Sequence, residues 1–131
     1  MDLSNAKKVL VEFQKKHEDY LVKAANYAAW KSLPFWKRWF TKRVEAPRRD
    51  YLYENYVIIS NSHLHIELRM YYSREEKSIT LAINENNCGY KINVATGRVS
   101  HYLGRVNPNI SPKAATLLES IRKELAPLYV E

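Results

Sequence analysis

The spacing of apolar residues changes from a helical to a strand-like period along this chain, and that change limits the folds open to it. Before residue 30 apolar side chains recur at steps of three and four, on one face of a helix. From Tyr51 to Leu103 they alternate with polar residues, as in strands with one buried face. A second helical pattern follows Ser111 and Pro112, two residues that suit a helix start. This order predicts the α+β class.

We expect a single domain over residues 1–131, with two N-terminal helices, a five-stranded antiparallel meander and one C-terminal helix. The helical part covers 1–46 and the sheet covers 51–104. The helices are expected over 5–29, 34–44 and 111–126. The strands are expected over 51–60, 63–72, 78–84, 90–94 and 98–103. Because the apolar residues of the middle strands share one side, the helices should pack on that face of the sheet.

The positive charge of the chain is concentrated in one short segment. The net charge is +7, and residues 30–49 carry a balance of +6 because only Glu45 opposes their basic residues. These basic residues are Lys31, Lys37, Arg38, Lys42, Arg43, Arg48 and Arg49. A localised block of one sign attracts anions, so these side chains are the candidate binding residues.

The same segment is rich in aromatic residues, which a helical wheel over 34–44 separates from the basic ones. Phe35, Trp36, Trp39 and Phe40 fill roughly one half of the wheel, whereas most of the basic residues fall on the other half. Since aromatic side chains dominate core energetics, we expect the aromatic half to dock on the sheet. Truncating Trp39 to alanine would then cost about 3–5 kcal/mol of stability.

Residues 63–69 place four polar side chains on one face of the expected second strand: His63, His65, Glu67 and Arg69. We interpret them as the solvent face of an amphipathic strand, with no metal and no cofactor. Two alternatives remain open. The two histidines and Glu67 offer ligands to zinc or iron. In a small nuclease, His65 would act as base or acid, Glu67 as its partner, and Arg69 would hold phosphate.

The spelling His-Leu-His at residues 63–65 resembles the metal motif of HUH single-strand nucleases. Those enzymes also use a nucleophilic tyrosine on a helix, for which Tyr129 near the chain end is the candidate. His101 is a third histidine of the sheet region. An unbroken alternation would place it with Val99 and Leu103 on the core side, away from the other two.

Other features of the sequence narrow the class of protein. No apolar run approaches the roughly 18 residues that a membrane span needs. The first residues lack the uninterrupted apolar segment of a signal peptide. A single cysteine, Cys88, allows no internal disulfide framework, and a cytoplasmic protein is the expectation.

These observations favour a non-enzymatic binding protein that uses residues 31–49 to contact an anionic partner, in the first place nucleic acid or a nucleoprotein machine. One alternative is a small accessory or inhibitor protein, of phage or mobile-element type, that binds an acidic protein surface. A second is the small nuclease described above. A third is a peripheral membrane protein with Trp36 and Trp39 at the interface.

Overall fold

A computed structural model describes residues 2–47, 51–86, 88–103 and 110–131, with the backbone alone for 100–103. Its helices are α1 (Ser4–Lys31), α2 (Phe35–Arg38) and α3 (Pro112–Leu125), with a 3₁₀ turn η1 (Ala126–Leu128). Its strands are β1 (Tyr51–Ser60), β2 (Leu64–Ser73), β3 (Lys77–Glu85), β4 (Cys88–Asn93) and β5 (Val99–Leu103). Neighbouring strands follow chain order and pair antiparallel. The expected α+β class, with an N-terminal helix, an antiparallel sheet and a C-terminal helix, is confirmed.

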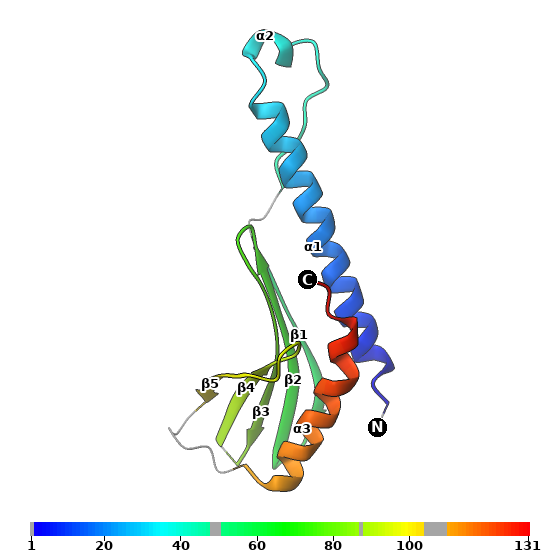
Figure 1. Cartoon of the computed structure of the whole chain (residues 1–131), viewed down its shortest axis with the longest axis vertical. Coiled ribbons are helices and arrows are strands. Elements are labelled where there is room, and N and C mark those ends of the chain that lie inside the picture. Colours follow the sequence, from blue (N-terminus) through cyan, green and yellow to red (C-terminus); the bar gives the residue numbers. More distant parts are fainter. Residues whose placement is uncertain (1, 48–50, 87, 104–109) are drawn as a thin grey trace.

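The core lies between one face of the sheet and the two long helices, which Figure 1 shows on the same side of the strands. Leu68 of β2 and Leu81 of β3 are paired across the sheet and are fully buried. Phe13 of α1 and Leu118 of α3 belong to the same buried cluster. The alternation read from the sequence therefore assigns the inner face of β2 and β3 correctly.

Only the N-terminal part of α1 takes part in this core. Phe13 and Tyr20 are buried, whereas Leu21 and Val22 are exposed, and no residue of α1 after Tyr20 is buried. A 28-residue helix is about 42 Å long. Figure 1 shows its C-terminal half extending beyond the sheet, with α2 at its far end. We call residues 21–47, which form this projection and the returning chain, the arm.

The second helix is much shorter than predicted. Instead of residues 34–44, it covers the single turn Phe35–Arg38. An isolated helix of that predicted length is marginal in water, and the tertiary contacts that would have stabilised it are absent from the described structure. The Thr41 hydroxyl also donates to the carbonyl oxygens of Lys37 and Arg38, at 3.3 and 3.4 Å. This side chain satisfies groups that a continuing helix would have bonded through its backbone.

The buried amide of Gln14 ties α1 to the C-terminal residues and to β3. Its Nε2 donates to the carbonyl of Leu128 at 2.8 Å, and its Oε1 accepts from the Val130 N–H at 2.7 Å. The Lys77 ammonium donates to the same Oε1 at 3.3 Å and lies 4.6 Å from the centroid of the Tyr129 ring. Both polar atoms of this buried amide side chain are thereby used, and the packed part of α1 is tied to the C-terminal residues and to β3.

The structure predicts opposite outcomes for two aromatic truncations. Phe13→Ala removes a fully buried ring and should lower the free energy of unfolding by about 3–5 kcal/mol. Trp39→Ala removes an 80% exposed ring and should change it by no more than about 0.5 kcal/mol. Urea denaturation followed by circular dichroism measures both. A loss for Trp39→Ala comparable to that for Phe13→Ala would mean that the aromatic residues dock after all.

Candidate functional site

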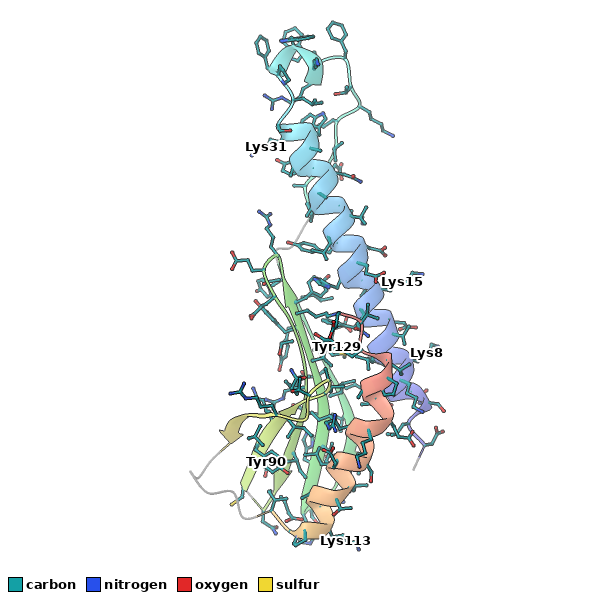
Figure 2. The ribbon with its side chains drawn as sticks, in the orientation of Figure 1. Lys8, Lys15, Lys31, Tyr90, Lys113 and Tyr129 are labelled. Atoms are coloured by element: carbon teal, nitrogen blue, oxygen red, sulfur yellow. The ribbon has the colours of Figure 1, made fainter. Side chains whose placement is uncertain are left out.

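The aromatic side chains around α2 lie in solvent at the end of the arm. We call residues 30–43 the tip. Relative exposures are 64% for Phe35, 55% for Trp36, 80% for Trp39 and 87% for Phe40. In Figure 2 the side chains beyond Lys31 project at the end of the molecule farthest from α3. The prediction that the aromatic half docks on the sheet is therefore wrong, and the large stability cost expected for truncating Trp39 loses its structural basis.

The exposure of the aromatic side chains could have been predicted from the lengths of the helices and strands, which a helical wheel does not take into account. The inner sheet face is already covered by the first part of α1 and by α3, whose Leu118 and Ile121 are buried in the core. A continuous helix through Lys31 carries the next residues past the sheet. A comparison of the length of the first helix with the length of the strands would have indicated that no uncovered sheet surface remains for Trp36 and Trp39 to pack on.

The basic residues of the tip lie among these exposed rings. The ammonium of Lys37 is 5.4 Å from the centroid of Trp36, and that of Lys31 is 5.7 Å from the centroid of Tyr27. Lys42 and Arg43 follow in the returning chain and are exposed. Five of the seven predicted binding residues are thus gathered on the arm, whereas Arg48 and Arg49 lie outside the described residues.

Arg38 occupies a particular position in the tip. Its guanidinium carbon lies 5.8 Å from the centroid of Trp30, so the cation stacks back against the end of α1. Within the described residues its guanidinium makes no ion pair with a carboxylate, and the buried Nε of Arg38 and Nε1 of Trp30 lack hydrogen-bond partners. Because Nε is buried, an external phosphate or carboxylate would have to be met by the outer nitrogens of the planar guanidinium.

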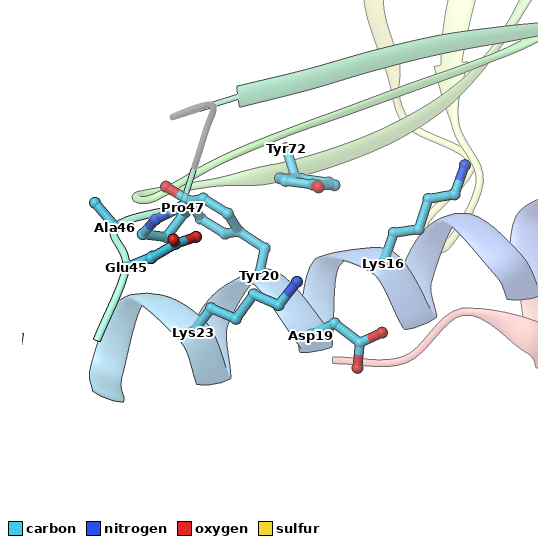
Figure 3. A pocket seen from close by; sticks show the side chains of 8 residues that line it. All are labelled: Lys16, Asp19, Tyr20, Lys23, Glu45, Ala46, Pro47 and Tyr72. Carbon is cyan, nitrogen blue, oxygen red and sulfur yellow. The ribbon is translucent and has the colours of Figure 1, made fainter. Parts of the chain in front are cut away.

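Negative charge is absent from the sequence of the distal arm. Residues 20–44 contain six basic residues and no acidic one. The nearest acidic residues in sequence are Asp19 and Glu45, which both line a hollow of about 740 Å³ at the root of the arm. Figure 3 shows this hollow between α1, the returning chain and Tyr72 of β2. Because Lys16 and Lys23 also line it, its charges are mixed, and the uniformly positive surface is the tip.

The opposite face of the sheet carries the polar residues of β2 in a connected chain. The Nε2–H of His65 donates to Glu67 Oε2 at 3.2 Å, and Nδ1 lies 3.4 Å from the Ser60 hydroxyl, which can donate to it. The Nε–H of Arg69 donates to the other oxygen of Glu67. Three of the four predicted residues are therefore brought together. His63 lies outside the strand, in the turn before it, where its N–H donates to Asn61 Oδ1.

Glu67 is more buried than the predicted exposed face implies, with an exposure of 8%. Its strand neighbours Val57 and Ala82 flank it, and the side chains of His65 and Arg69 bond to its carboxylate. Burial alone would raise the pKa of Glu67. The hydrogen bonds from Arg69 and His65, together with the positive charge of Arg69, outweigh burial and lower the pKa below its usual value. The carboxylate is therefore an ionised partner in an ion pair.

This arrangement bears differently on the two nuclease alternatives. The contact of His65 with Glu67 is the pairing that the metal-free alternative expects, whereas Arg69, its candidate for holding phosphate, is bonded to Glu67. Both oxygens of Glu67 are engaged, and no group of three histidine, cysteine or acidic side chains that could hold a metal ion occurs among the described residues. Tyr129 packs beside Lys77 against the helix-covered core, whereas His65 lies on the other face of the sheet. The tyrosine needed by an HUH-type reaction is thus not near the histidines.

His101 is expected on the core side only if the register of the last strand is unbroken. The pairing of β4 with β5 shifts between Lys91 and Ile92, and Lys91 pairs with His101. A bulge of this kind reverses the alternation beyond it, so parity does not place this residue. The side chain of His101 lies outside the described residues.

Comparison with known proteins adds no relative. No protein-family model matches the chain, and neither a curated protein nor a solved structure matches it. Within the described residues no helix is both long enough and apolar enough to cross a membrane.

The ion pair of Glu67 predicts a pH-dependent contribution to stability. Glu67→Gln should lower the free energy of unfolding by about 1–3 kcal/mol near neutral pH, because it weakens charge-assisted hydrogen bonds. Since the folded-state pKa is lowered, this contribution is complete above the unfolded pKa of about 4.3 and is lost as the pH falls through the folded pKa. Urea titrations from pH 7 downward measure it. A difference between the proteins that stayed constant into acid would contradict the assignment.

The polar sheet face also predicts a result for catalysis. We expect no cleavage of RNA or single-stranded DNA above background, with or without added divalent metal, because Arg69, the residue that would hold phosphate, is bonded to Glu67. Gel analysis of labelled oligonucleotides tests this. Cleavage that disappeared in a folded His65→Ala variant would instead assign an enzymatic role to this face.

Proposed function

We propose that this protein is a non-enzymatic binding protein that uses the tip of its arm to contact an anionic partner. The observation that carries the proposal is the exposure of four large aromatic side chains among basic residues in a segment without acidic ones. Large exposed apolar clusters on soluble proteins mark interaction sites. The uniform positive charge indicates which kind of partner is favoured.

The energetics of the tip support a binding role. Burying a large apolar side chain stabilises by about 1.5–3 kcal/mol, and Trp39 and Phe40 gain none of this in the free protein because they are 80% and 87% exposed. A partner that covers them recovers that energy. The described contacts of Lys37 and Arg38 are with aromatic rings and not with carboxylates, so binding need not break an ion pair.

The rest of the molecule supports this division of roles. The core is formed by α1, α3 and the inner sheet face, and Gln14 ties the packed part of α1 to the C-terminal residues. The polar residues on the outer sheet face satisfy one another around Glu67. Among the surfaces described, the tip combines the largest exposed aromatic side chains with one sign of charge.

Charge reversal at the tip tests this proposal. Lys37→Glu with Arg38→Glu should leave thermal stability nearly unchanged, because exposed or half-exposed charges contribute little. Binding to two anionic probes, a fluorescent single-stranded DNA oligonucleotide and phosphatidylserine-containing vesicles, is measured at low and at physiological salt. The variant should lose affinity for whichever probe the native protein binds, and most strongly at low salt.

A matched control separates tip binding from net charge. Lys113→Glu with Lys123→Glu makes the same change in net charge on exposed residues of α3, and Figure 2 shows Lys113 at the opposite end of the molecule. This control should keep most of the affinity. Equal losses in both double variants, or no binding of the native protein to either probe, would overturn the proposal.

A further inference from the structure

We infer that the anionic partner of the tip is a lipid bilayer containing anionic lipids, and that the rings of Trp36, Trp39 and Phe40 insert into its headgroup region. This inference rests on the proposed function, since it names the partner of the same surface. It is carried by the order of side chains along the arm, by the distance of Asp19 from the tip, and by the convex shape of the tip.

The apolar side chains lie where a flat surface would meet the molecule first. Figure 1 places α2 at the extreme end of the long axis, and the most exposed aromatic residues, Trp39 and Phe40, directly follow this turn. Tryptophan is enriched at the membrane–water interface because its ring is amphipathic. A projecting turn that presents two tryptophans and two phenylalanines can enter that layer without rearrangement of the core.

The cations lie at the right place to meet lipid headgroups. Lys31 precedes the exposed rings in the chain, Lys37 and Arg38 lie among them, and Lys42 and Arg43 follow them. When the rings enter the interface, these side chains come level with the phosphates and carboxylates of the lipids. Stable peripheral binding needs two such signals, apolar insertion and a basic cluster, and the tip supplies both.

The length of α1 keeps Asp19 away from the bilayer surface. Lys31 is twelve residues beyond Asp19 on α1, which corresponds to about 18 Å along the helix axis. This exceeds two Debye lengths of about 8 Å each at physiological salt. Glu45 lies back at the root of the arm, beside Tyr20 (Figure 3). The repulsion between the Asp19 carboxylate and an anionic surface is therefore largely screened. Glu45, two residues after Arg43, lies within about 7 Å of it along the chain and is the acidic residue nearest to the cations of the tip.

The shape of the tip favours a bilayer over single-stranded nucleic acid. Proteins that bind single strands use a positively charged groove along which several phosphates and bases lie. The tip is instead the convex end of a projection, and Trp39 packs edge-on against Phe35 with ring centroids 6.2 Å apart. A fluid bilayer can close around a convex apolar end, whereas an oligonucleotide would leave much of it in water.

Insertion is tested with a single fluorescent reporter. Trp30→Phe with Trp36→Phe leaves Trp39 as the only tryptophan of the chain. We expect its emission to shift to shorter wavelength, and to be quenched by brominated acyl chains, on addition of phosphatidylcholine vesicles that contain phosphatidylserine. Vesicles of phosphatidylcholine alone should give a much smaller response at the same lipid concentration.

Two further variants measure the contributions of rings and charges. Trp39→Ser with Phe40→Ser should weaken vesicle binding at least about a hundredfold in sedimentation assays. Lys37→Glu with Arg38→Glu should weaken it about thirtyfold or more. The matched control for the rings is Tyr51→Ser with Tyr53→Ser, which removes two aromatic residues of β1 that are exposed by 60% and 52%. This control should bind like the native protein.

The outcomes distinguish the two proposals. Tip-dependent binding of the DNA oligonucleotide without vesicle binding would overturn the bilayer inference and leave the proposed function standing. Vesicle binding without a blue shift or bromine quenching of Trp39 would also overturn insertion. Binding of neither probe would overturn both proposals. Insertion-dependent vesicle binding, lost in the ring variant and kept in the Tyr51 and Tyr53 control, supports the inference.

Discussion

The inner face of the sheet has room for only part of the helical surface that the chain supplies, and the rest of the structure follows from this limit. The first part of α1 and the whole of α3 cover that face and complete the core around Phe13 and Leu118. Because helical hydrogen bonds continue through Lys31, the helix does not stop where its packing stops. The arm and its exposed tip result from that mismatch between a long helix and a filled core.

The fold class follows from the sequence because each element carries its own local signal. Strict alternation in β2 and β3 identifies the buried face, since Leu68 and Leu81 must point to the same side. Ser111 is identified as the start of α3 by its capping chemistry, and its hydroxyl does accept from the Ala114 N–H at 3.2 Å. These patterns involve residues close together in the sequence, so they can be interpreted without information about the rest of the molecule.

The sequence predicts the candidate site only in part. The site depends on which apolar side chains remain exposed once the core is filled, and local patterns do not show this. The wheel correctly grouped Trp36 with Trp39, but amphipathicity alone does not say whether the apolar side meets protein or solvent. The same limit applies to Glu67, whose strand face was predicted although its burial was not. In both cases the deciding contacts, or their absence, come from residues distant in sequence. The contact of Lys77 with Gln14 is a third such case, invisible to any local pattern.

The uneven distribution of charge has a consequence for the approach to any negatively charged surface. Residues 20–44 carry +6 of the total of +7, so the centre of charge is displaced from the centre of mass toward α2. A body with such an electric dipole experiences a torque before it makes contact. The protein would rotate while still diffusing and arrive with its aromatic end leading, which raises the share of collisions that are productive. The electric field of the negatively charged surface would thus orient the whole molecule before any single residue makes contact.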